Sequence, residues 1–197
     1  EAWHGFMPGR PDTGKDVPPE NNYNTLSDWL TGELRQDFTF VHPELLQGNL
    51  YSVHDGRLVL NTRQTRQEYR LLILPAGKVI SAETLKRIKE FYDKGGRILA
   101  TGQLPVQSAE FGRDTEITAL IGQIFGIDPT RPMPAKETSA ANKQGGRAIF
   151  VPAVTRETLR TAIARLVPSP DVRIPLLADM KAPADSLGGP LGVLRDH

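Results

Sequence analysis

The chain has 197 residues and a mass of 21.7 kDa, enough for one domain with a sizeable core. Its charged fraction of 24% and formal net charge of +1 give no electrostatic reason to expect nucleic acid or a membrane surface as a partner. The absence of cysteine excludes disulfides, thiolate metal sites and a cysteine nucleophile, and no apolar run approaches the roughly 20 residues of a membrane span.

Residues 1–22 read as a loop-like lead-in, because prolines and glycines interrupt them throughout. Trp3 is the one aromatic side chain there that is open to stacking on a sugar ring. Glu1 begins neither a signal peptide nor an intact translation product, so we expect a processed or trimmed chain, or a fragment.

Four short elements are expected next. Residues 23–34 have the apolar spacing of an amphipathic helix, capped by Asn24 or Thr25. Residues 37–41 read as a short strand, and Pro43 opens one turn of helix. Residues 49–60 form a hairpin, because the Asp-Gly pair at its centre supplies the positive φ angles of a tight turn.

Residues 69–102 form the unit around which the chain is organised. Leu71 to Leu74 are a continuous apolar run, as expected of a strand buried on both faces. A helix capped by Ser81 follows, Gly95 and Gly96 end it, and a strand begins at Ile98. This order predicts two neighbouring parallel strands joined by a helix.

The rest of the chain also reads as helices and strands joined by loops. A loop over residues 103–112 precedes a helix from Asp114 to Phe125. Residues 128–146 are rich in proline, lysine, alanine and glycine and are expected to be mobile. A strand at 147–152 and a helix capped by Thr155 complete an α/β domain over residues 23–167. Residues 168–197 read as a proline-rich linker with a possible edge strand at Val172–Ile174.

Ligands of doubly wound sheets bind at the carboxyl ends of the strands. The side chains expected there, and so the candidate ligand-facing residues, are His42, Glu44, Gln103, Ser108 and Glu110. No glycine-rich phosphate motif and no nucleophile elbow occurs, and the four histidines lack the spacing of a zinc site. We therefore expect no catalytic residue, no metal and no cofactor in this chain.

Each candidate has a structural alternative. His42 and Glu44 can act as an acid–base pair, or His42 ends the strand while Glu44 occupies the first turn of the next helix. Glu110 and Asp114 can hold a cation or flank a glycosidic bond, or both cap a helix. Ser108 is either a nucleophile or a loop or capping serine. In all three cases the structural role is favoured.

The order of these pieces resembles a known domain type. The segments that carry the resemblance are the helix at 23–34, Asp37-Phe-Thr-Phe-Val-His-Pro-Glu-Leu-Leu46, Val53-His-Asp-Gly-Arg-Leu58, Tyr69-Arg-Leu-Leu-Ile-Leu-Pro75, Gly95-Gly96 and Thr101-Gly-Gln-Leu-Pro105. They are similar to the flavodoxin-like domain, related to class I glutamine amidotransferases, that follows the catalytic barrel in large glycoside hydrolases. The alpha-L-rhamnosidases of glycoside hydrolase family 106 are the most similar, and the trimerisation domain of family 42 beta-galactosidases is more distant. The likeness covers residues 20–125 and, weakly, Pro190–His197.

The resemblance implies a flavodoxin-like, mainly parallel sheet with the hairpin at 49–60 as an insertion. It implies a non-catalytic domain whose partner is the rest of the parent polypeptide, a barrel and β-domains, with carbohydrate nearby and a periplasmic or extracellular location. A free-standing small-molecule hydrolase or ligand-binding domain is the alternative. In the flavodoxin-like strand order, a strand should lie between residues 37–41 and 69–75. We expect that position to be filled from outside this numbering, by Leu58–Leu60, or by Val172–Ile174.

Overall fold

The computed structural model describes residues 22–168, which form a mixed α/β domain. Its main sheet has four strands in the order β4-β6-β9-β8. Strands β4 (Leu71–Leu74), β6 (Arg97–Thr101) and β9 (Arg147–Val151) are parallel, and β8 (Thr138–Ala141) is antiparallel to β9. The predicted strand–helix–strand unit is therefore confirmed, with Leu71 opposite Arg97 in the register.

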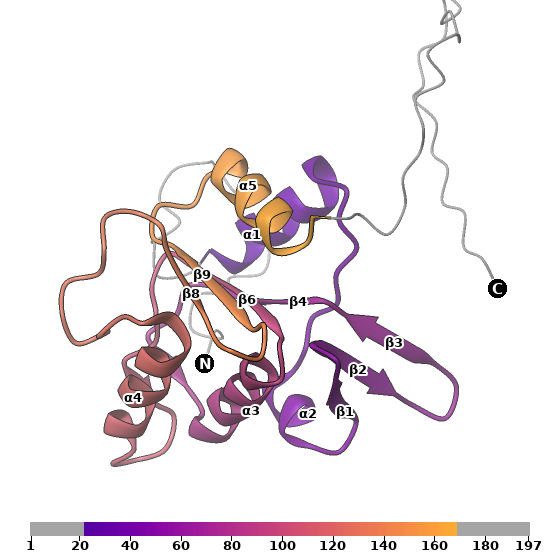
Figure 1. Cartoon of the computed structure of the whole chain (residues 1–197), viewed down its shortest axis with the longest axis horizontal. Coiled ribbons are helices and arrows are strands. Elements are labelled where there is room, and N and C mark those ends of the chain that lie inside the picture. Colours follow the sequence, from indigo (N-terminus) through magenta and orange to yellow (C-terminus); the bar gives the residue numbers. More distant parts are fainter. Residues whose placement is uncertain (1–21, 169–197) are drawn as a thin grey trace, which may run out of the picture.

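Helices cover both faces of this sheet (Figure 1). On one face lie α1 (Tyr23–Asp28), the π-helical turn η2 (Trp29–Glu33) and α5 (Arg156–Leu166), packed on Leu99 and Ile149. On the other lie α2 (Pro43–Gln47), α3 (Ala82–Asp93) and α4 (Asp114–Phe125), packed on Ile98 and Phe150. The buried side chains of β6 and β9 thus divide the core into two apolar clusters.

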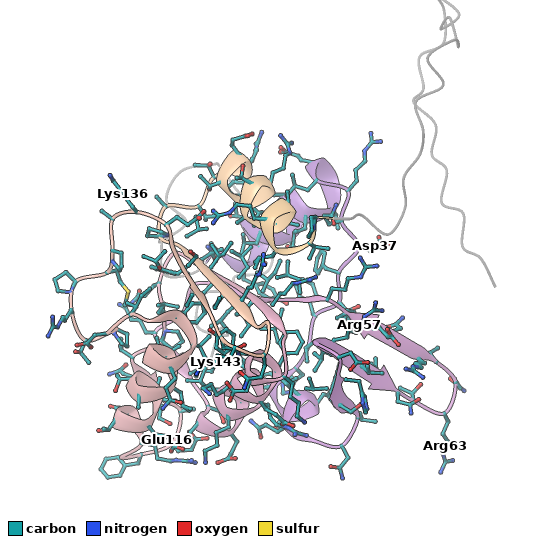
Figure 2. The ribbon with its side chains drawn as sticks, in the orientation of Figure 1. Asp37, Arg57, Arg63, Glu116, Lys136 and Lys143 are labelled. Atoms are coloured by element: carbon teal, nitrogen blue, oxygen red, sulfur yellow. The ribbon has the colours of Figure 1, made fainter. Side chains whose placement is uncertain are left out.

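A second, antiparallel sheet consists of β1 (Tyr51–His54), β2 (Arg57–Asn61) and β3 (Arg66–Tyr69). The predicted hairpin is confirmed, and the φ angles of Asp55 (48°) and Gly56 (69°) are those that its tight turn requires. Sequence analysis missed β3, whose exposed polar residues lead directly into β4. Figure 2 shows Arg63 at the outer end of this sheet. Strands β5 (Val79–Ile80) and β7 (Gln107–Ser108) form a short parallel pair.

The segment 128–146 contains a strand that the sequence did not suggest. Strand β8 lies inside it and pairs with Arg147 to Phe150 of β9, so this part of the segment is held in the sheet. Its residues are Thr-Ser-Ala-Ala, and only the tertiary partner makes them a strand. The side chain of Asn142 fixes the following turn by accepting hydrogen bonds from the amides of Gln144 and Gly146.

The strand predicted at residues 37–41 is wrong. These residues have no regular secondary structure, and their backbone makes no hydrogen bond within the described part of the chain. They nevertheless alternate like a strand: Phe38 packs on the cluster under α1 and α5, whereas Val41 packs on the cluster under α3. Figure 2 labels Asp37 where this segment leaves η2 and runs past β4 toward α2.

Strand β4 is an edge strand within residues 22–168, because only β6 pairs with it there. All four of its residues are half-buried, so the expectation of a strand buried on both faces is wrong for this position. Leu58–Leu60 cannot occupy the outer edge of β4, since β2 already pairs with β1 and β3. The position that the sequence analysis expected to be filled is therefore open within the described residues.

Helix capping differs in detail from the predictions. Thr155 caps α5 as predicted, through a reciprocal capping box with Thr158. Asn24 and Thr25 do not cap α1, which begins at Tyr23 after Asn22. Asp114 is the first residue of α4 and not its cap. Trp3 and Val172–Ile174, with the lead-in and the proline-rich linker, lie outside the described residues.

Glycines allow three turns to meet at the amino ends of the strands. A Cβ on Gly56 would lie 2.6 Å from the carbonyl oxygen of Gly95, and one on Gly146 would lie 2.1 Å from that of Tyr92. The β1–β2 turn, the α3–β6 turn and the β8–β9 turn therefore depend on residues without side chains. The three turns therefore lie in close contact with one another at this end of the sheet.

Candidate functional site

The carboxyl ends of β4 and β6 are joined by the side chain of Asn22. Its amide nitrogen donates to the hydroxyl of Thr101 over 2.9 Å, and its amide oxygen accepts the backbone N–H of Ala76 over 2.9 Å. Asn22, Ala76 and Thr101 are all buried. This amide thus fixes the start of α1 to the place where a doubly wound sheet binds ligands.

Glu110 is the centre of a second polar cluster. One of its carboxylate oxygens accepts the Ser81 hydroxyl over 2.8 Å. The other accepts the backbone N–H of Ala82 over 3.0 Å and the Ser108 hydroxyl over 2.5 Å. Ala82 is the first residue of α3, so the Glu110 carboxylate caps a helix that lies 28 residues earlier in the chain.

These hydrogen bonds hold the pKa of Glu110 well below its usual range, at about 2, and the backbone N–H of Ala82 is the main cause. The Ser108 and Ser81 hydroxyls lower the pKa further. All of these donors favour the charged form of the carboxyl group. A carboxylate of this kind is a poor general acid or base near neutral pH, because a catalytic group needs a pKa close to the working pH.

The capping alternative for Glu110 is therefore the one that the geometry supports, although the helix is α3 and not α4. Ser81 occupies the N-cap position of α3 but makes no capping bond itself, since its hydroxyl donates to Glu110. Gln47 completes the cluster from α2, donating to the Ser81 hydroxyl over 3.2 Å and to the Thr84 hydroxyl over 2.8 Å. Asp114 accepts the backbone N–H of Ser108 over 2.7 Å.

His42 and Glu44 lie at the start of α2. The Nδ1 atom of His42 accepts the backbone N–H of Glu44 at 3.4 Å and lies 4.0 Å from its carboxylate. Their side chains are 53% and 84% exposed, so no enclosure supports acid–base chemistry here. Glu44 occupies the first turn of the helix, as its structural alternative predicted.

Gln103 follows β6 at the carboxyl end, and its backbone carbonyl accepts the N–H of Gly77 over 3.3 Å. Within residues 22–168, neither Gln103 nor His42 makes a side-chain hydrogen bond with Ser108 or Glu110. The structure therefore brings Ser108 and Glu110 together, and His42 and Glu44 together, but joins no larger set of the five candidates. No nucleophile–base–orienter arrangement arises from them.

A hollow in the described part of the chain lies elsewhere. It has a volume of about 390 Å³ and is lined by Asp55, Gly56, Arg57, Arg70, Gly95, Arg97, Val167 and Pro168. These residues stand at the amino ends of β4 and β6, opposite the candidate residues. Arg57 is already engaged there by Glu68 at 2.6 Å, and Arg70 is also engaged in an interaction.

Asn22 and Gln47 were missed by sequence reasoning. A lone asparagine before a helix suggests a local cap, and nothing in the pattern indicates partners more than fifty residues away.

Among residues 22–168, no three histidine or carboxylate side chains gather where they could bind a metal ion. The helices of the same part of the chain are all too short or too polar to cross a membrane.

Comparisons of the chain with models of protein families, with curated proteins and with solved structures found no match.

Proposed function

We propose that this chain is a non-catalytic domain of a larger carbohydrate-active enzyme, of the kind that resembles the alpha-L-rhamnosidases of glycoside hydrolase family 106. Its role is to pack beside a catalytic barrel and to border the sugar site. The observation that carries the non-catalytic role is the use of Glu110. The best-placed carboxylate at the strand ends is fully occupied by Ser81, Ala82 and Ser108, and serves to cap α3.

The arrangement of the layers supports a flavodoxin-like domain. Strands β4, β6 and β9 follow one another as do the third, fourth and fifth strands of the order 2-1-3-4-5. The first and last helices lie on one face and the middle helices on the other (Figure 1). The short β8 and the antiparallel sheet β1-β2-β3 are additions to that pattern.

Exposed apolar side chains support a packing role. Phe111 is completely exposed, and Leu45 and Leu50 are 45% and 42% exposed. The chain on both sides of Phe111 is anchored, because Glu110 caps α3 while Arg113 pairs with Glu83 and Glu116 over 3.0 and 2.8 Å. A large, exposed aromatic side chain is typical of the anchor residues of protein interfaces.

The non-catalytic role is tested by assaying the purified 197-residue chain on 4-nitrophenyl α-L-rhamnoside, other aryl glycosides, 4-nitrophenyl acetate and glutamine. We expect no turnover above the buffer rate. Turnover that is lost in both Ser108→Ala and Glu110→Ala chains, with folding retained by circular dichroism, would overturn the proposal in favour of the free-standing hydrolase.

The domain role is tested on the reading frame that encodes the segment. A catalytic barrel encoded upstream and in frame supports the proposal, whereas a start codon immediately before Glu1 contradicts it. In the parent polypeptide, Phe111→Ser should increase proteolytic release of the domain at least about threefold, and Arg63→Ser, in the exposed turn between β2 and β3, serves as the control.

A further inference from the structure

The hollow at the amino ends of β4 and β6, with its volume of about 390 Å³, has a mainly cationic wall. Arginine outnumbers acid there, since Arg57, Arg70 and Arg97 are accompanied by Asp55 as the single acidic residue of the lining. The volume lies in the range of roughly 300–1,000 Å³ that is usual for sites of small ligands. A hollow with this lining favours a small ligand that carries negative charge.

Two glycine turns hold two of these arginines in place. Arg57 begins β2 directly after Gly56, and Arg97 begins β6 shortly after Gly95. A Cβ on Gly56 would lie 2.6 Å from the carbonyl oxygen of Gly95, so the two turns are in direct contact. Figure 2 labels Arg57 at the start of its strand. Both cations therefore stand on strands, which position side chains more precisely than loops do.

The guanidinium group of Arg97 has no partner in the described part of the chain. Arg97 is half-buried, yet within residues 22–168 its side chain makes no hydrogen bond and no ion pair. Arg57 is only partly used, because Nη1 alone of its nitrogens donates to Glu68, over 2.6 Å. Arg70 already has an interaction and adds only its charge. A guanidinium group presents five N–H donors in a fork that matches the oxygens of a carboxylate or a phosphate, so unused donors of that kind line the hollow.

A further cation lies beside the hollow on the neighbouring strand. Arg147 begins β9 and is the register partner of Arg97. The two side chains lie on one face of the sheet, because strands alternate and the next residues of that face, Leu99 and Ile149, both pack toward α5. Arg147 also makes no side-chain hydrogen bond or ion pair among residues 22–168. Two positive charges on adjacent strands repel each other, and an anion bound beside them relieves that repulsion.

Arg97 also has a purely structural interpretation. Val167 and Pro168, which follow the end of α5, line the same hollow. A cation near the carboxyl end of a helix is stabilised by the partial negative charge of the last carbonyl groups. This role would account for one positive charge, but it explains neither the hollow nor the second unpaired arginine beside it. The two interpretations have different consequences, because the helix role affects stability and the ligand role affects binding.

We propose that this hollow binds a small ligand through a phosphate or carboxylate group, with Arg97 as the main contact and Arg57 and Arg147 adding positive charge. Asp55 lies in the same wall and repels the anionic group, which limits the affinity. The site stands at the end of the sheet opposite the five candidate residues, and the inference does not depend on the proposed function.

The proposal is tested by calorimetric titration of the full 197-residue chain with sodium pyrophosphate and, separately, with sodium citrate. The first probe carries phosphate groups and the second carries carboxylate groups, so the tighter binder identifies the group that the hollow prefers. We expect at least one probe to bind, and its affinity to fall as the salt concentration is raised, because salt screens the charges. Failure of both probes to bind at low salt overturns the proposal.

Arg97→Gln removes the central guanidinium group, and Arg63→Gln, in the exposed turn between β2 and β3, is the control because it changes the net charge equally (Figure 2). Arg97→Gln should weaken binding of the probe at least about tenfold, the effect of losing a hydrogen bond to a charged group. Arg63→Gln should change the affinity by less than about twofold, since an exposed charge outside the site is screened. Arg97→Lys should bind with intermediate affinity, because lysine keeps the charge but not the fork. Equal weakening by the two glutamine variants would indicate a general charge effect and contradict the site.

A second variant keeps the proposal testable if Arg97→Gln fails to fold. Asp55→Asn removes the acid from the wall, and the turn accepts it, because Asp55 has a φ of 48° and asparagine before glycine suits a tight hairpin turn. The probe should then bind at least about twofold more tightly, since a repelling charge is gone. Unchanged or weaker binding would contradict a site in this hollow. Thermal melts without probe measure the helix role: a less stable Arg97→Gln chain with unchanged binding would assign Arg97 to α5 alone.

Discussion

The Asn22 amide donates to the Thr101 hydroxyl over 2.9 Å, joining residues 79 positions apart in the sequence. The same side chain accepts the N–H of Ala76, so one amide ties α1 to the carboxyl ends of two parallel strands. A buried side chain with two long-range hydrogen bonds is costly to remove, because its partners remain in the core without water.

Replacing Asn22 by alanine should therefore lower the free energy of unfolding by roughly 1–3 kcal/mol. Asn24→Ala is the control: Asn24 lies on the same helix, is exposed and makes no side-chain hydrogen bond within the described residues. Urea denaturation of both variants measures the difference. A double-mutant cycle with Thr101→Val should give a coupling energy of at least about 0.5 kcal/mol. If the effects of the two substitutions are additive, the hydrogen bond between Asn22 and Thr101 contributes no measurable stability.

Glu110→Gln should destabilise the protein in a pH-dependent manner. Folding lowers the pKa of Glu110 from 4.5 to about 2, so below neutrality the unfolded chain takes up this proton before the folded chain does. The stabilisation by the carboxylate is complete above about pH 4.5 and is lost as the pH falls toward 2. At pH 7 the variant should be less stable by about 0.5–2 kcal/mol, the usual value of a helix cap.

The difference between wild type and Glu110→Gln should shrink steadily between pH 5 and pH 2.5 in urea titrations. Glu44→Gln, which removes a carboxylate of α2 that is 84% exposed, is the control. If the difference in the free energy of unfolding between wild type and Glu110→Gln stays constant with pH, the carboxylate charge is not what caps α3.

Alanine substitutions at two glycine positions should change the stability of the protein in opposite directions. Gly146→Ala should destabilise the protein by at least about 1–3 kcal/mol, because the added methyl group would lie 2.1 Å from the carbonyl oxygen of Tyr92. Gly32→Ala should stabilise it by about 0.5–1 kcal/mol, since Gly32 lies in a helical turn with nothing within 4 Å of the added group. Thermal melts of the two variants should move in opposite directions.

The position of β4 at the sheet edge predicts an order among core truncations. Leu99→Ala should cost about 2–5 kcal/mol, because Leu99 is fully buried between β4 and β9. Leu72→Ala should cost about half as much, since its side chain is only half-buried within residues 22–168. Chemical denaturation gives both values. A cost at Leu72 equal to that at Leu99 would contradict the position of β4 at the sheet edge.

The sequence by itself determined the elements whose stability is local. The Asp55-Gly56 pair specifies the tight hairpin turn, and Thr155 specifies the start of α5, because the partners of these residues lie within a few positions. The strand–helix–strand unit from β4 to β6 also followed from the sequence, since the apolar run, the amphipathic helix and the glycine stop all agree.

Tertiary structure decided the features that depend on distant partners. Residues 37–41 have the composition of a strand but find no backbone partner among residues 22–168, while the Thr-Ser-Ala-Ala of β8 becomes a strand because β9 pairs with it. Glu110 caps α3 only because the fold returns the loop to Ala82, and Asn22 reaches Thr101 only across the assembled sheet. A hydrogen bond between residues far apart leaves no periodic trace in the sequence, because its geometry exists only after the chain has folded.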